Sequence, residues 1–319
     1  MRRRTFLQVS SAVLGTSLKT LADAPMPMAT LGKTGLRVSR YTVGGFHMAV
    51  NGEDMGIKII HRALDLGVNF FDSAWLYHQG RSDEIYGKAL SPSMRKKVLL
   101  MGKAERRTAE GAMQQLEDTL RRMRTDYLDL WQCHQVTEMS EVEQILGPKG
   151  ALEAFVKAKQ QGKVRHIGFT GHADPAVHQK LLAATDAWET VQHPVNLVDP
   201  HYLSFIQNVL PKVGQKGLGR IAMKSNAMGS IRRSGVATIA ECLRFALSQD
   251  IDTLVSGAET VEQLEENILV VKTFKPMSQQ EMTSLLERTR KGPHGTQIER
   301  YKRKQTGAAC ALHRDGDCV

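Results

Sequence analysis

The chain has 319 residues, of which 41% are hydrophobic and 24% are charged, and its formal net charge is +10. This composition excludes a disordered or collagen-like chain and supplies enough apolar residues for a large core. Basic residues crowd the C-terminal end, namely Arg300, Lys302, Arg303 and Lys304. We interpret them as a solvated tail, because no nucleic-acid-binding motif accompanies them.

The first 24 residues read as a targeting segment. An arginine triplet at residues 2–4 precedes a short apolar stretch over residues 9–18, and an Ala-x-Ala pattern ends at Ala24. The stretch is too short and too polar to span a bilayer. The segment is similar to a twin-arginine (Tat) signal, with the Arg3-Arg4 pair carrying the match. We therefore expect recognition by the Tat machinery, cleavage after Ala24 and a periplasmic product. An uncleaved basic leader on a cytoplasmic protein is the alternative.

The remaining chain alternates short apolar or β-branched runs with amphipathic stretches. A hairpin is predicted over Ala29–Ser39, with its turn at residues 33–35. The predicted strands are Val38–Gly44, Val68–Ala74, Val98–Lys103, Tyr127–His134, Val164–Thr170, Thr190–Val195, Gly219–Lys224 and Thr253–Gly257. Helical periodicity is found between and after them, in Ile57–Leu66, Ala109–Arg124, Leu152–Gln161 and Val261–Phe274.

Eight strand–helix units without a linker predict a (β/α)₈ TIM barrel over residues 25–290. We expect the hairpin to close the bottom of this barrel, and an extra helix and the basic tail, residues 291–319, to follow it. A doubly wound open sheet is the alternative, but the early Gly-x-Gly-x-x-Gly turn typical of that fold is missing from the sequence.

Four polar residues fall where predicted strands end, which is where TIM barrels carry their chemistry. Asp72, Lys103 and His134 end the second, third and fourth strands, and Tyr77 follows five residues after Asp72. A buried lysine and a buried aspartate are costly unless they pair. Beside a tyrosine, the pair forms a proton-transfer device, because a nearby cation favours the ionised phenol. Each residue alone has an ordinary structural explanation, but their joint placement favours catalysis, with His134 orienting a carbonyl or sharing the proton.

At these residues the chain resembles the aldo/keto reductase family, over about residues 28–275. The stretches that carry the resemblance are Gly67–Ala74, Gly80–Glu84, Gly87–Leu90, Leu128–His134, Gly162–His172 and Glu259–Asn267. The family's catalytic tetrad falls on Asp72, Tyr77, Lys103 and His134. The resemblance implies an NAD(P)-dependent oxidoreductase that moves a hydride between nicotinamide and a small carbonyl, alcohol or sugar-like substrate. Tyr77 would be its general acid and base.

The resemblance also implies a cofactor site. Its residues would be Thr170, Gln192, Met223, Lys224, Ser225, Asn226, Gly257, Thr260, Gln263 and Asn267. Gly171 stands where the family usually has a carboxamide-binding Asn, and Met223 stands where many members stack an aromatic ring on the nicotinamide. Gln263 replaces an arginine that often binds the 2′-phosphate, which removes a bidentate partner. NADP is therefore the first expectation, and NAD is the alternative.

The four cysteines predict neither a metal site nor a redox motif, because no Cys-x-x-Cys pair occurs. Cys133 and Cys242 lie in apolar segments and are expected in the core. Cys310 and Cys318 share the tail, and their pairing is left open. The chain resembles a bacterial branch of the family in which some members carry a C-terminal iron–sulfur cluster, but the spacing of these two cysteines does not match one.

Two other functions remain open. Some aldo/keto relatives are cofactor-sensing subunits of larger assemblies, and an exported enzyme can retain its nucleotide for internal redox turnover. In this fold the loops after the strands set specificity, so the sequence predicts no particular substrate. We expect Gly45–Asn51, Gln135–Lys149 and the chain after Lys291 to form the walls of the pocket.

Overall fold

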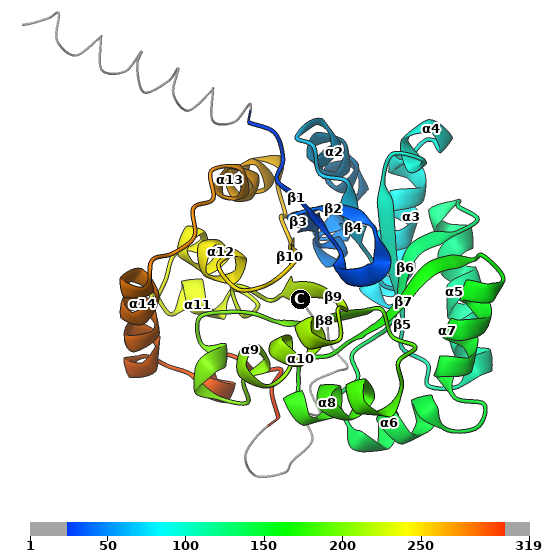
Figure 1. Cartoon of the computed structure of the whole chain (residues 1–319). Helices are drawn as coiled ribbons and strands as arrows, with labels where there is room; N and C mark the ends of the chain where they lie inside the picture. The colour runs from blue at the N-terminus through cyan, green and yellow to red at the C-terminus, as the bar shows by residue number, and fades with distance from the viewer. Residues whose placement is uncertain (1–23, 304–319) are drawn as a thin grey trace, which may run out of the picture.

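Parallel strands close into a barrel in the order β10-β3-β4-β5-β6-β7-β8-β9 in the computed structural model, which describes residues 24–303 (Figure 1). The strands are β3 (Tyr41–Val43), β4 (Phe70–Asp72), β5 (Leu99–Ala104), β6 (Leu128–Cys133), β7 (Val164–Thr170), β8 (Thr190–Pro194), β9 (Gly219–Met223) and β10 (Thr253–Ser256). The predicted TIM barrel is confirmed, and β7 has the predicted bounds.

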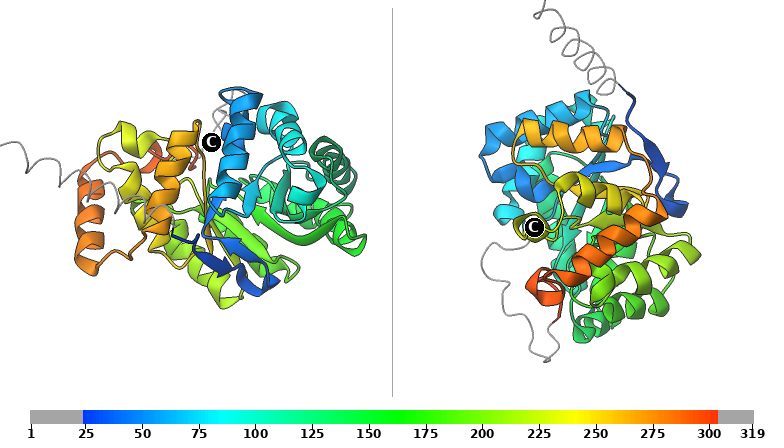
Figure 2. Two further views of the ribbon diagram at one scale, coloured as in Figure 1. Left: turned by 90° about the horizontal axis from the view of Figure 1, so that it is seen from above. Right: turned by 90° about the vertical axis from the view of Figure 1, so that its left-hand side faces the viewer.

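Helices surround the barrel on its outside (Figure 2). The longer ones are α2 (Glu53–Asp65), α3 (Arg81–Ala89), α5 (Ala109–Met123), α6 (Met139–Leu146), α7 (Ala151–Gln160), α8 (Pro175–Ala184), α10 (Leu210–Gln215), α12 (Ile239–Leu247), α13 (Val261–Lys272) and α14 (Gln279–Lys291). Helix α5 shows why they pack: it buries Ala112, Leu116, Leu120 and Met123 on one face. Three further short helices are α4 (Pro92–Arg95), α9 (Phe205–Asn208) and α11 (Ser230–Arg233).

The N-terminal hairpin closes the bottom of the barrel, as predicted. It consists of β1 (Met28–Thr30), η1 (Gly32–Thr34) and β2 (Arg37–Ser39). The Lys33 amide donates to the Gly217 carbonyl at 2.8 Å, just before β9 begins. The prediction of one strand over Val38–Gly44 is wrong, because the chain bends at Arg40. Its first part pairs with β1, and its second part enters the barrel as β3.

Side chains alternate along each strand, and this alternation carries the polar residues to the top of the barrel interior. The lower interior is apolar and is filled by Leu31, Val38, Phe70, Met101, Leu130, Ile221 and Val255. Two residues beyond Phe70 and Met101, on the same inward face, stand Asp72 and Lys103. The strands thus place the candidate catalytic groups directly above a dry apolar layer.

The C-terminal part of the described chain packs on the barrel. Helix α14 lies outside the ring and is linked to α12 by ion pairs of Arg244 with Glu281 and of Arg288 with Glu241 (Figure 2). Residues 295–303, which begin with η5 (Gly295–Gln297) and which we call the C-terminal strap, then run along the top of the barrel. The prediction of a solvated tail is wrong for Lys302, which is fully buried, whereas Arg300 is exposed.

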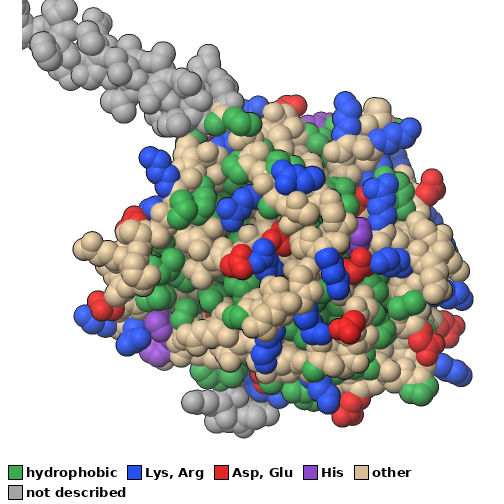
Figure 3. All heavy atoms as spheres, in the orientation of Figure 1, with side chains coloured by type: hydrophobic (Ala, Val, Ile, Leu, Met, Phe, Trp, Pro, Cys, Tyr) green, Lys and Arg blue, Asp and Glu red, His purple; other side chains and the backbone are tan. Residues whose placement is uncertain are grey.

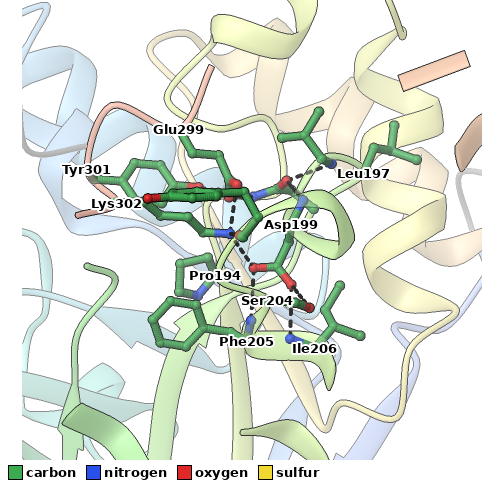
Figure 4. A network of polar contacts seen from close by, with 12 residues as sticks. Pro194, Leu197, Asp199, Ser204, Phe205, Ile206, Glu299, Tyr301 and Lys302 are labelled. Atoms are coloured by element: carbon green, nitrogen blue, oxygen red, sulfur yellow. Dashed lines mark hydrogen bonds and ion pairs between the residues drawn. The ribbon is translucent and has the colours of Figure 1, made fainter. Parts of the chain in front are cut away.

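A polar network anchors the C-terminal strap (Figure 4). The Lys302 ammonium lies 2.7 Å from Asp199 Oδ1 and 2.7 Å from Glu299 Oε2, and it also donates to the Tyr202 carbonyl. Asp199, in η4 (Asp199–His201), accepts backbone N–H bonds from the start of α9. Two carboxylates and a carbonyl oxygen therefore compensate for the cost of burying the Lys302 charge.

Several predictions concern residues at or beyond the limits of the described chain. Cys133 and Cys242 are buried, as predicted. The leader over residues 1–23, Lys304, Cys310 and Cys318 lie outside the described residues. Within residues 24–303, no helix is long and apolar enough to cross a membrane. On the face shown in Figure 3, basic and acidic side chains are interspersed rather than gathered by sign.

Candidate active site

The predicted tetrad assembles on one wall of a cavity at the top of the barrel. Lys103 Nζ is ion-paired with Asp72 Oδ1, donates to the Ser73 carbonyl at 2.9 Å and reaches the Tyr77 hydroxyl at 3.3 Å. The rings of Tyr77 and His134 meet edge to face, with centroids 5.6 Å apart. All four predicted catalytic side chains therefore lie together, although 62 residues separate the first from the last.

The loop that carries Tyr77 is held in an unusual backbone conformation. Tyr77 begins η3 (Tyr77–Gly80), in which His78 and Gln79 have positive φ angles of 47° and 58°. Such angles are uncommon for residues other than glycine, and they persist where the surroundings impose them. Here the His78 ring bonds the Phe46 carbonyl at 2.8 Å, and the Phe46 ring packs against the edge of Tyr77. The phenol is thus fixed from both sides.

Burial dominates the electrostatics of the Asp72–Lys103 pair, because both side chains are almost inaccessible to solvent. Burial raises the pKa of Asp72, and the charge of Lys103 opposes that rise. Burial likewise lowers the pKa of Lys103, and Asp72 opposes that change. Each partner therefore favours the charged form of the other, in a place where burial disfavours both charges.

His134 is a neutral imidazole in this site. Burial lowers its pKa well below the usual value, and the positive charges of Lys103 and Arg107 lower it further. Arg107 also fixes the backbone at this point, because its guanidinium donates to the His134 carbonyl at 2.8 Å. A neutral His134 can donate one hydrogen bond to a carbonyl oxygen but is a poor proton source near pH 7. Among the four residues, Tyr77 is therefore the candidate proton donor.

The cavity is large enough for a nucleotide and a small substrate, with a volume of about 980 Å³. It is lined by the tetrad and by the predicted cofactor residues Thr170, Gln192, Met223, Lys224, Ser225, Asn226, Gly257, Gln263 and Asn267. Thr260 is not among the lining residues. Its hydroxyl instead caps α13, accepting from the Gln263 amide at 3.3 Å. Nine of the ten residues predicted to bind the cofactor therefore line one cavity.

The inner part of the cavity fits a nicotinamide carboxamide. Gln192 is 1% exposed, and its Oε1 has no hydrogen-bond partner within the described chain. Its Nε2 makes only a weak contact with Met223 Sδ at 3.7 Å. A buried acceptor left open is costly unless a ligand supplies a donor, which the amino group of a carboxamide would do.

The outer part of the cavity presents charges of both signs. Arg232 and Arg233 of α11 line it together with Glu259 and Glu266, and both arginines are exposed. The Gln263 side chain is already engaged there, because its Oε1 accepts from the Glu259 amide at 2.9 Å. Cations at this end suit the phosphates of a dinucleotide.

Sequence reasoning missed part of this lining. Phe46, His47 and Gln135 come from two of the three segments predicted to wall the pocket, whereas the third, after Lys291, supplies no lining residue within residues 292–303. Arg232 and Arg233 gave no signal, because an Arg-Arg pair on a short helix resembles any solvated surface. Gly257 has a structural reason to be glycine, because an added Cβ would lie 1.8 Å from the His47 ring.

Comparison with known proteins agrees with the family resemblance. The aldo/keto reductase family model matches residues 42–238. The chain is 27% identical to an L-galactose dehydrogenase of Arabidopsis thaliana, over 80% of this chain and 91% of that protein. It is 29% identical to a 6-dehydroglucose reductase of Novosphingobium aromaticivorans, over 46% and 53% of the two chains. The holo form of aldo-keto reductase AKR11C1 from Bacillus halodurans has a similar fold, with a TM-score of 0.70, 23% identity and coverage of 86% and 99%.

A parallel barrel with a dinucleotide-sized cavity and a Tyr–Lys–Asp–His wall defines a nicotinamide-dependent oxidoreductase. The chain belongs to the aldo/keto reductase family, as its sequence predicted.

Proposed function

We propose that this protein transfers a hydride between NAD(P)(H) and a small carbonyl or alcohol substrate, with Tyr77 as the general acid and base. The observation that carries the proposal is the Tyr77 hydroxyl 3.3 Å from Lys103 Nζ, on the wall of the cavity. When bound, the nicotinamide supplies or accepts the hydride at the substrate carbon.

The chain's own residues manage the proton. During reduction, the Tyr77 O–H donates its proton to the carbonyl oxygen as that oxygen gains negative charge. The phenolate left behind is stabilised by Lys103, which Asp72 holds in place. Neutral His134 donates a hydrogen bond to the same oxygen. In alcohol oxidation, the Tyr77 phenolate accepts the hydroxyl proton, and the other groups keep their roles.

Turnover on a panel of aldehydes, ketones and sugars tests this proposal. Oxidation of the reduced nucleotide should depend on the carbonyl compound and yield the alcohol in equal amount. Tight nucleotide binding without turnover across the panel would instead favour the cofactor-sensing alternative, for which an intact tetrad is not needed.

For the cofactor, we propose NADP(H) with weak discrimination against NAD(H). Gln263 offers no positive charge for a 2′-phosphate, and the Glu259 and Glu266 carboxylates line the same end of the cavity. The exposed Arg232 and Arg233 partly offset these carboxylates. Dissociation constants for NADPH and NADH, measured side by side, should differ by much less than a thousandfold. A preference for NADPH of about a thousandfold or more, about 4 kcal/mol, would show that other groups replace the missing arginine.

For location, we propose export through the Tat machinery, supported by the Arg3-Arg4 pair in the sequence. That route carries folded proteins, so nucleotide can bind before export. Replacing both arginines by lysine should leave full-length protein in the cytoplasm, as seen by fractionation and intact mass. Unchanged export of this variant would refute the proposal.

A further inference from the structure

The cavity wall carries a cation that the proposed hydride transfer does not use. Four cations of the described chain line the cavity: Lys103, Lys224, Arg232 and Arg233. Lys103 is neutralised by Asp72, and Arg233 is bound to the Met228 carbonyl and the Ser230 hydroxyl on the rim. Lys224 stands at the top of the barrel directly after β9, and the proposed proton transfer gives it no role.

The charge of Lys224 affects the pKa values of two histidines on the cavity wall. Burial is the main cause of the low pKa of His134, and the charge of Lys224 adds to it. His47, whose pKa burial lowers to about 4, is affected by Lys224 as well. These two histidines follow β6 and β3, while Lys224 follows β9. All three residues line the same cavity.

The backbone at Lys224 is in the left-handed region, with φ of 56°. This conformation costs free energy for a residue with a side chain, and such residues cluster at functional sites. The following Ala227 and Met228 also have positive φ angles, of 44° and 58°. The turn after β9 therefore holds Lys224 in a direction that a relaxed turn would not impose.

The C-terminal strap supports Lys224 from behind. The Tyr301 ring lies 5.1 Å beneath Lys224 Nζ and meets the His172 ring edge to face at 5.3 Å. Tyr301 is itself fixed, because its hydroxyl donates to Glu299 Oε1 at 2.7 Å and accepts from Asn196 Nδ2 at 3.0 Å (Figure 4). A cation held over an aromatic face keeps its charge and position with little conformational freedom.

We propose that Lys224 binds a carboxylate on the substrate, so that this enzyme acts on carbonyl compounds or alcohols that also bear an acidic group. The inference rests on the proposed hydride transfer for its orientation: the carbonyl faces Tyr77, and the carboxylate faces Lys224. An ammonium in a partly desolvated cavity forms charge-assisted hydrogen bonds, which are stronger than neutral ones. His172, also on the cavity wall, adds a polar group on the same side.

Ligand binding tests this inference without requiring turnover. Benzoate and benzamide are titrated by calorimetry into protein saturated with oxidised nucleotide. Benzoate should bind at least about tenfold more tightly, which corresponds to about 1.4 kcal/mol. In Lys224→Gln the two should bind within about twofold of each other, and Lys224→Arg should restore the preference. Lys216→Gln is the matched control, because it removes an equal charge that pairs with exposed Asp186 outside the cavity. It should leave the preference unchanged.

A second variant guards against misfolding. Lys224→Asn removes the charge and tolerates the left-handed backbone, so it should fold and lose the preference as Lys224→Gln does. Equal binding of the two ligands by the wild type would overturn the inference, as would a preference that survives loss of Lys224. A large loss of nucleotide affinity in these variants would also overturn it, because Lys224 would then serve the cofactor phosphates.

Turnover separates this inference from the proposed function. With 4-carboxybenzaldehyde and its methyl ester as substrates, the wild type should favour the acid in kcat/KM by about tenfold, and Lys224→Gln should not. No turnover of either aldehyde, with benzoate still preferred in the binding experiment, would contradict hydride transfer but leave the Lys224 site standing. Equal turnover of both would contradict only the Lys224 site.

Discussion

Two lysines are buried among residues 24–303, and their burial has different consequences. Lys103 and Lys302 are 2% and 0% exposed, and each touches a carboxylate and a backbone carbonyl. Lys103 also reaches the Tyr77 hydroxyl and lines the cavity, whereas Lys302 is enclosed between Asp199 and Glu299 (Figure 4). Burial and pairing are common to both. What distinguishes a reactive site is a transferable proton next to the cation and an open space in front of it.

The largest effect is expected at the proton itself. Tyr77→Phe keeps the ring and its packing against Phe46 and His134 but removes the hydroxyl. General acid catalysis contributes about 10²–10⁴ to the rate, so kcat should fall by that factor. Steady-state rates and nucleotide titration are the measurements, and the nucleotide dissociation constant should change by less than about twofold. Near-wild-type turnover on a good substrate would exclude Tyr77 as the acid.

The single variant Lys103→Met and the double variant Tyr77→Phe/Lys103→Met test whether the two residues act in the same step. Both residues serve one proton transfer, so their effects on kcat should not add. Loss in the double variant equal to the product of the single losses would mean that Lys103 acts independently of Tyr77.

The next effect concerns the enclosed lysine. Lys302→Met leaves Asp199 and Glu299 buried without their cation, and breaking a buried pair in this way costs about 3–5 kcal/mol. Urea unfolding should show this loss of stability, and kcat of the folded fraction should fall far less than in Lys103→Met. Lys216→Met is the control on an exposed pair, where the loss of stability should be far smaller. A loss below about 1 kcal/mol at Lys302 would contradict its anchoring role.

The smallest expected effect concerns the pH dependence of stability at Asp83. Unlike Asp72, this buried carboxyl has no ion pair with a lysine of residues 24–303. Asp83 is fully buried and accepts only hydroxyl bonds, from Ser73 at 2.5 Å and Thr119 at 2.9 Å. Burial raises its pKa to about 6, against about 3.9 in an unfolded chain. Between these values the folded protein binds more protons, so this residue's contribution to stability falls as pH rises from about 4 to 6. Two pKa units correspond to about 3 kcal/mol.

Asp83→Asn cannot ionise and should lack this dependence. Urea unfolding at pH 4.5 and 7.5 should show the variant gaining about 2–3 kcal/mol relative to wild type at the higher pH. A difference between the two proteins that is independent of pH would mean that Asp83 titrates near its ordinary value.

The comparison of the two lysines also shows which features can be predicted from the sequence. The barrel was predictable because buried parallel strands are short apolar runs, and the tetrad was predictable because Asp72, Lys103 and His134 end such runs. Lys302 gave no comparable signal. Its partner Asp199 lies 103 residues earlier in the sequence. No local pattern distinguishes a lysine that folds inward from one in a basic tail. The Lys302–Asp199 pair is therefore visible only in the folded structure.

Partners that are distant in the sequence also explain why the predicted strand Val38–Gly44 divides at Arg40 and how Lys224 is oriented. One apolar run covers two strands, because the residues that bend the chain bond to partners far away: the Arg40 side chain donates to the Leu247 carbonyl at 3.1 Å. Lys224 was predicted as a cofactor residue from its place in the chain. Its direction over the cavity depends on Tyr301 beneath it, which belongs to the C-terminal strap.

The most direct test of hydride transfer at this cavity follows a deuterium label from the nucleotide to the product. Nucleotide carrying deuterium at the transferable position of the reduced nicotinamide is mixed with 4-carboxybenzaldehyde and the wild-type protein, and the alcohol is analysed by mass spectrometry. The alcohol should contain one deuterium at the former carbonyl carbon, and Tyr77→Phe should form it about 10²–10⁴ times more slowly with the same labelling. Alcohol without deuterium, or nucleotide bound tightly and never consumed with any carbonyl compound, would contradict the mechanism.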